Sequence, residues 1–250
     1  MTLPAWVFGI FGAVVGSFLN VCIDRLPEDK SLVSPPSHCP DCERRLQPHE
    51  LIPILSYLYL RGRCRTCQTR IPLRILLVEV GTALLFWLAW RRAGTGWMAL
   101  YFFVNISLLL AIGVIDLEHE RVLNTLVYPG MIWGGLAIPL FHTAAPWNHL
   151  AGGGLGFVTL LLIALISSGA MGMGDVKLGL LMGLVLGFPD IILAYLIAFI
   201  TGGLIAGILL VLKKIGRKDT IAFGPFLATA GIITLLYGDL ILRWWLRSIT

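Results

Sequence analysis

The sequence predicts an all-α polytopic membrane protein with about eight transmembrane helices and a small zinc-binding cytoplasmic domain inserted between the first and second of them. Three observations support this fold class. Hydrophobic residues make up 57% of the 250-residue chain and charged residues 13%, with a mean hydropathy of +0.86. A soluble domain would carry roughly 25% charged residues. Long apolar runs recur along the chain, and four cysteines lie in its one long polar segment.

The apolar runs define the predicted helices, because a bilayer core requires about 20 helical residues and polar or Gly/Pro-rich breaks separate the runs. The first run lacks the basic start and the cleavage site of a signal peptide, so we expect it to be retained. The sixth is short and either begins inside the membrane or lines a cavity. The predicted spans are residues 4–22, 75–90, 97–115, 123–141, 150–168, 177–189, 190–212 and 221–242.

The chain is divided accordingly into a first transmembrane helix (1–22), a zinc domain (23–74) and a transmembrane core (75–250). Fifteen of the 19 Lys and Arg residues fall in one set of alternating loops. The positive-inside rule places this set in the cytoplasm, so both termini face outward. The basic residues border apolar spans or lie in one segment, which favours membrane lipid over nucleic acid as the partner of the +5 net charge.

Four cysteines in two CxxC pairs predict a structural zinc site in the polar segment. Cys39 and Cys42 form the first pair, and Cys64 and Cys67 form the second, with 21 residues between the pairs. Four thiolates suit tetrahedral zinc and leave no position open for substrate. Two disulfides and a redox CxxC are the alternatives. A cytoplasmic segment keeps its thiols reduced, and two matched pairs favour one shared site. His38, which precedes Cys39, is a bystander in this interpretation.

The sequence around Asp175 is the main candidate for a functional site. Gly172 and Gly174 precede this carboxylate between two apolar runs, and glycines allow a backbone to approach a ligand closely. Ionisable groups within membrane segments are usually functional. The alternative is an ordinary Gly-rich loop with a solvated acid. Lys177 could orient the carboxylate or extend to the interface with its charged end.

Asp116 is the natural partner of Asp175, because each lies where an apolar run meets the predicted cytoplasmic face. Two carboxylates held close together share a proton. One can then activate water as a base while the other polarises a carbonyl group, which is the chemistry of an aspartic protease. Glu118 and Glu120 are expected in a hydrated loop.

Several ordered motifs resemble those of the type IV prepilin peptidases, which are membrane aspartic proteases of the GxGD type. The resemblance covers nearly the whole chain. It departs from the family pattern at Leu123, where a proline is common, and at Ala222, where a proline often precedes the next element. The matching motifs are Gly16-Ser17-Phe18-Leu19-Asn20-Val21, Arg25-Leu26-Pro27, the tetracysteine segment, Ile115-Asp116, Gly172-Met173-Gly174-Asp175-Val176-Lys177-Leu178 and Phe223-Gly224-Pro225-Phe226-Leu227-Ala228.

The resemblance implies an enzyme of the bacterial inner membrane with Asp116 and Asp175 as the catalytic pair. Such enzymes cut the basic leader from type IV prepilins or pseudopilins after a glycine, on the cytoplasmic side and before an apolar stem. Many also methylate the new N-terminal residue, usually phenylalanine, with S-adenosylmethionine. The polar segment implies this second activity here, with Arg74 and Glu79 as candidates for the methyl-donor site. The alternative for both residues is an interfacial ion pair. The alternatives are a peptidase only, a proton-coupled transporter or a non-catalytic scaffold.

Overall fold

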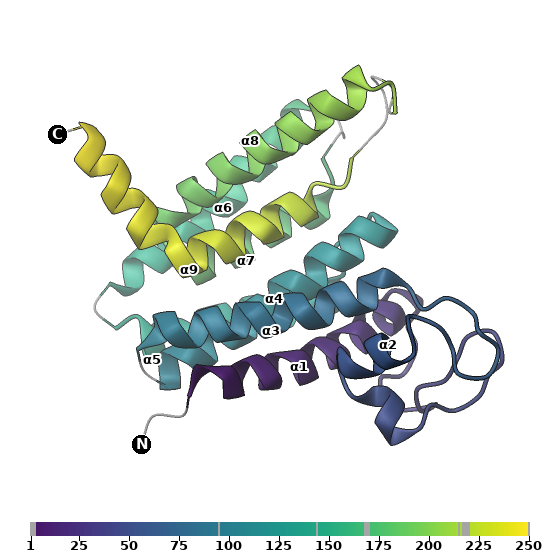
Figure 1. Ribbon diagram of the computed structural model, residues 1–250. Coiled ribbons are helices and arrows are strands. Elements are labelled where there is room, and N and C mark those ends of the chain that lie inside the picture. Colours follow the sequence, from purple (N-terminus) through teal and green to yellow (C-terminus); the bar gives the residue numbers. More distant parts are fainter. Residues whose placement is uncertain are drawn as a thin grey trace. The chain divides into compact units, whose positions relative to one another are not determined.

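The protein is described by a computed structural model that covers residues 4–94, 96–143, 145–167, 171–214, 216 and 221–249. Within these residues the regular structure is helical, apart from two isolated β-bridges. The helices are α1 (Ala5–Arg25), η1 (Leu26–Glu28), η2 (Pro48–Leu51), α2 (Leu55–Tyr59), α3 (Leu73–Ala93), α4 (Gly96–His119), α5 (Asn124–Phe141), α6 (Pro146–Ile166), α7 (Met173–Leu186), α8 (Asp190–Val211) and α9 (Gly224–Ile249) (Figure 1).

Each predicted apolar run corresponds to one helix, but the count of eight spans is not confirmed. Six described helices are long and apolar enough to cross a membrane: α1, α3, α4, α6, α8 and α9. The other two are α5, which contains Pro129 and Pro139, and α7, which has only 14 residues. The predicted fifth span ends at Ser168, which lies outside the described residues, as do Arg217 and Lys218 of the predicted cytoplasmic set.

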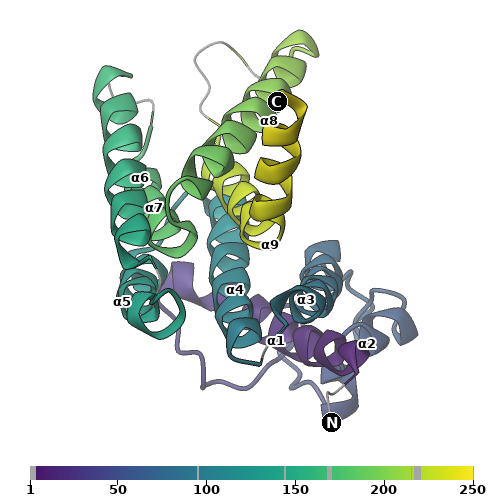
Figure 2. The same ribbon diagram turned by 90° about the vertical axis from the view of Figure 1, so that its left-hand side faces the viewer.

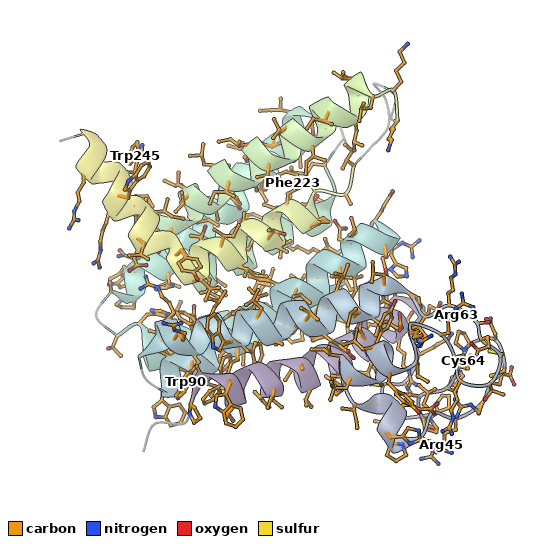
Figure 3. The ribbon with its side chains drawn as sticks, in the orientation of Figure 1. Arg45, Arg63, Cys64, Trp90, Phe223 and Trp245 are labelled. Carbon is orange, nitrogen blue, oxygen red and sulfur yellow. The ribbon has the colours of Figure 1, made fainter. Side chains whose placement is uncertain are left out.

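The chain forms two compact units, residues 1–107 and 108–250. In the first unit α1 packs along α3. The side-chain amide of Asn20 donates a hydrogen bond to the carbonyl oxygen of Ile75 at 3.0 Å. The rings of Phe8 and Trp90 stack with centroids 3.7 Å apart. The polar segment between these helices contains η1, η2 and α2, and Figure 3 shows Arg45, Arg63 and Cys64 together in its loops.

In the second unit, α7 packs against α5, α6, α8 and α9, and α6 and α7 run side by side (Figures 1 and 2). Their backbones touch: a Cβ atom on Gly183 would lie 2.0 Å from the carbonyl oxygen of Gly152. Small residues allow membrane helices to approach this closely. The Tyr195 hydroxyl of α8 donates to the Gly156 carbonyl at 2.7 Å. These contacts hold α7, which carries Asp175, at the centre of its unit.

Candidate active site and metal centre

Asp175 lies in the first turn of α7, which begins four residues before the predicted span 177–189. Gly172 precedes the helix with extended backbone (φ −72°, ψ 146°), and its carbonyl oxygen accepts the Asp175 backbone N–H at 3.1 Å. The Asp175 residue is only 9% exposed. An acid in a first helical turn faces the positive end of the helix dipole. The helix start therefore holds this carboxylate inside the protein.

Asp116 lies on α4, one turn before the end of the helix, and is 5% exposed. Its Oδ2 atom accepts the backbone N–H of Gly224 at 2.9 Å. Gly224 is the first residue of α9, so a free N–H group at the start of that helix orients the carboxylate. The position of Asp116 at the end of its helix agrees with the sequence analysis. Its hydrogen bond to the Phe223-Gly224-Pro225 motif was not predicted.

A cavity of about 750 Å³ brings Asp116 and Asp175 together. Both carboxylates line it, as do Gly172 and Gly174. Most of the other lining residues had no predicted role in the site. They come from the α4–α5 loop and the start of α5, the end of α6, the segment before α7, α8 and the segment before α9: Glu120, Arg121, Val122, Leu123, Asn124, Ile163, Ser167, Met171, Phe199, Ile221, Ala222 and Phe223. The cavity can hold a water molecule and a peptide segment beside two acids.

The loop between α4 and α5 packs directly on the start of α7. A Cβ atom on Gly174 would lie 2.7 Å from the Cβ of Val122, so this glycine makes room for the loop. The Lys177 ammonium donates to Asn124 Oδ1 at 2.9 Å and lies 5.2 Å from the centre of the Tyr128 ring. Lys177 therefore joins α7 to the start of α5. The partners of Gly174 and Lys177 in the α4–α5 loop and in α5 were not predicted from the sequence.

The four predicted zinc ligands meet in the polar segment of the first unit. The Sγ atoms of all four cysteines lie within 4.8 Å of one another. The Sγ atoms of Cys39 and Cys67 are 3.6 Å apart, and those of Cys42 and Cys64 are 4.0 Å apart. Zn–S bonds of about 2.3 Å in a tetrahedron place sulfur atoms about 3.8 Å apart, whereas a disulfide requires about 2 Å. The cysteines are free thiols with the geometry of a metal site.

Two similar turns present these thiols. The backbone N–H of Cys39 donates to Arg44 O at 3.0 Å, and that of Cys64 donates to Thr69 O at 2.8 Å. The residue that follows each CxxC pair has a left-handed backbone conformation. Its φ angle is 53° at Glu43 and 59° at Gln68. Backbone N–H groups of Cys67 and Thr66 lower the pKa of the Cys64 thiol to about 6. A lower pKa favours the thiolate form of Cys64.

An ion pair between the partly exposed Arg44 and the buried Glu50 supports the first turn. The Glu50 carboxylate accepts two hydrogen bonds from the Arg44 guanidinium, at 2.9 and 2.8 Å, and one from the Gln47 backbone N–H at 2.8 Å. The backbone carbonyl oxygen of Arg44 accepts the N–H of Cys39 at 3.0 Å. The Arg44 hydrogen bonds, followed by that from Gln47, lower the pKa of Glu50 from 4.5 to about 2. Glu50 therefore fixes the arginine of the turn that presents Cys39 and Cys42.

Replacing Glu50 with glutamine should weaken zinc retention about ten-fold at neutral pH, in the range seen for groups that orient metal ligands. Because the folded-state pKa of Glu50 is lowered, its contribution is complete above pH 4.5 and is lost as the pH falls toward 2. Zinc release to a chelator at pH 7 measures the effect. The exposed Glu43 provides a matched control, since Glu43→Gln should release zinc as the unaltered protein does.

Arg74 and Glu79 lie at the junction of the polar segment and α3. The Arg74 guanidinium forms an ion pair with Asp24 near the end of α1. Glu79 is 4% exposed, and its Oε2 atom accepts the backbone N–H of Ile54 at 2.6 Å. These contacts tie the polar segment to α1 and α3.

Comparison with known proteins identifies the family. Residues 10–93 match the bacterial peptidase A24 N-terminal domain, and residues 103–207 match the type IV leader peptidase family. The prepilin leader peptidase/N-methyltransferase of Bacillus subtilis (strain 168) is 34% identical over 241 residues, which cover 95% of this chain and 96% of that protein. The chain belongs to the type IV leader peptidase family. The leader peptidase match contains both aspartates, and the N-terminal match contains all four cysteines.

Other relatives of this chain are also named prepilin leader peptidase/N-methyltransferase. The prepilin leader peptidase/N-methyltransferase of Pseudomonas aeruginosa PAO1 is 35% identical over 268 residues, which cover 95% of this chain and 92% of that protein. The protein of this name from Aeromonas salmonicida (strain A449) is 34% identical over 271 residues, which cover 96% and 93%. No solved structure gives a significant match to the chain. The similarity extends over both units rather than over one domain.

Proposed function

We propose that this type IV leader peptidase cuts the basic leader from type IV prepilins or pseudopilins with Asp116 and Asp175, and then methylates the new N-terminal residue. The observation that supports the peptidase most directly is the pair of buried carboxylates lining one cavity. Two such groups share one proton, so one acts as base toward a water molecule and the other as acid toward the scissile carbonyl. The names of the relatives favour this function over a transporter or a scaffold.

The location of the reaction is proposed from the charge distribution. With the basic loops in the cytoplasm, both aspartates lie on the cytoplasmic side of a multi-pass inner-membrane protein. An apolar stem can then stay in lipid while the leader reaches the cavity. Cleavage after a glycine, as in the family, is tested with purified protein in detergent or lipid and a synthetic prepilin, by measuring the mass of both products. An intact prepilin after prolonged incubation would contradict the proposal.

The methyl transfer is tested separately. Pilin that already lacks its leader is supplied with S-adenosylmethionine carrying a labelled methyl group, and incorporation of label at the N-terminus is measured. Absence of label with active leader cleavage would leave a peptidase only. We assign zinc a structural role, because the four cysteines complete a tetrahedral site. Arg74 and Glu79 remain candidates for the methyl-donor site, and each already has a partner within the first unit.

Gly224 should be essential for the geometry of the carboxylates. A Cβ atom at this position would lie 2.5 Å from Asp116 Oδ2, so an alanine must displace the carboxylate that its own N–H orients. Misplacement of a catalytic group by about 1 Å costs roughly a hundred-fold in rate. We therefore expect Gly224→Ala to lower kcat by about this factor. Gly203→Ala on α8, where nothing lies within 4 Å of an added Cβ, should cleave normally. Equal activity of both variants would contradict the assigned role of Gly224.

A further inference from the structure

The part of the polar segment that contains η2 and α2 has an exposed apolar surface. Five large apolar side chains between residues 48 and 59 are exposed, and among them Leu58 is 58% exposed and Tyr59 is 78% exposed. An exposed apolar patch of this kind indicates a surface that contacts another protein or a membrane. We call these five residues the α2 patch: Leu51, Ile52, Leu55, Leu58 and Tyr59.

Two hydrogen bonds place α2 beside the first turns of α3. The backbone N–H of Ile54, directly before α2, donates to Glu79 Oε2 at 2.6 Å. Glu79 follows Leu73, the first residue of α3, by six residues, which is about 9 Å along the helix axis. At the other end, the Tyr57 hydroxyl donates to the carbonyl oxygen of Ile71 at 3.4 Å. Figures 1 and 2 show α2 beside α1 and α3.

This position brings the α2 patch to the edge of a bilayer. The helix α3 is long and apolar enough to cross a membrane, and Leu73 and Leu77 in its first turns are exposed. A bilayer that covers these leucines also reaches the level of α2. Tyrosine is enriched at membrane interfaces. Arg61 and Arg63, which follow Tyr59, are exposed, and arginine side chains can extend from apolar surface to lipid headgroups.

We propose that the α2 patch inserts into the membrane leaflet next to the polar segment and holds the zinc-binding turns against the bilayer surface. Its partner is the lipid itself, with the apolar side chains at the boundary between headgroups and acyl chains, as in other interfacial segments. The hydrogen bond from Ile54 to Glu79 sets the depth of insertion. The inference requires that α1 and α3 cross the membrane, and it does not depend on the two carboxylates of the second unit.

The test uses the full-length protein in phosphatidylcholine nanodiscs, with photoreactive benzoylphenylalanine in place of one residue at a time. After illumination, mass spectrometry measures the lipid attached to each variant. Leu77 on α3 is the positive control. Arg65 is the matched control, because it is also exposed and its neighbour Cys64 lies at the end of the polar segment away from α3 (Figure 3). Leu58 should give a lipid yield near that of Leu77 and roughly ten-fold above that of Arg65, because an interfacial side chain lies among the lipids.

Zinc content equal to that of the unaltered protein shows that each variant has folded, and Tyr59 provides a second position in the α2 patch if the Leu58 variant loses zinc. Lipid yields at the α2 patch that are no higher than at Arg65, with Leu77 labelled, would overturn the proposal. Attachment of the α2 patch to a second copy of the chain, or to another part of the same chain, would also overturn it, because protein would then cover the patch.

Discussion

Replacing either Asp116 or Asp175 with asparagine should reduce prepilin cleavage on the order of a thousand-fold or more, because each carboxylate supplies a proton-transfer step that an amide cannot perform. Asparagine has nearly the same shape, and Asp116→Asn keeps an oxygen that can accept the Gly224 N–H. The cavity should therefore keep its form. The two single variants and the double variant should be almost equally inactive, since groups that act as a unit do not contribute additively. Initial rates with a saturating prepilin measure the effect.

A matched control separates chemistry from folding. Asp190→Asn alters another aspartate of the same unit, in the first turn of α8, and Asp190 does not line the cavity. This variant should cleave at nearly the normal rate. Helical circular dichroism and elution in detergent should be the same for all variants. Substantial cleavage by Asp116→Asn or Asp175→Asn would remove that residue from the proposed pair.

The positions of the two acids could be anticipated from the sequence for a simple physical reason. A carboxylate rarely stays in a hydrophobic segment without a function, so Asp116 at the end of one apolar run and Asp175 at the start of another are conspicuous. The CxxC spacing is equally informative, because four thiolates satisfy one metal ion completely. The apolar runs also located the long helices. They did not establish how many of them cross the membrane, since α7 is short and α5 contains two prolines.

The remaining features of the site depend on contacts between distant parts of the chain. The N–H of Gly224 reaches Asp116 across 108 positions in the sequence, and Lys177 reaches Asn124 across 53. Neither contact produces a periodic pattern in the sequence, because each is a single hydrogen bond between residues near the ends of helices. Val122 and Gly174 are also far apart in the sequence, and no sequence pattern predicts that they pack together. Glycine-rich motifs indicate that something lies close to the backbone, but they do not indicate what it is.

Replacing Cys64 with serine should remove zinc from the protein and unfold the polar segment. This segment has about 50 residues, which bury too little apolar surface to be stable without a metal or another link. Structural zinc sites contribute on the order of 10–16 kcal/mol of apparent binding energy in small domains. The zinc content should therefore fall from about one ion per chain to nearly none. Limited proteolysis should then cut within residues 23–74, between α1 and α3.

The fifth cysteine provides the control for this prediction. Cys22 is buried in α1 and does not belong to the four-cysteine cluster, so Cys22→Ala should retain zinc and resist protease. Cys39→Ser, on the other turn, should behave like Cys64→Ser, because a tetrahedral site needs thiolates from both turns. The loss should affect methyl transfer more than leader cleavage if the dyad in the second unit is independent of zinc. Full zinc content in either serine variant would contradict the four-cysteine site, and equal loss of both activities would show that the polar segment also supports the peptidase unit.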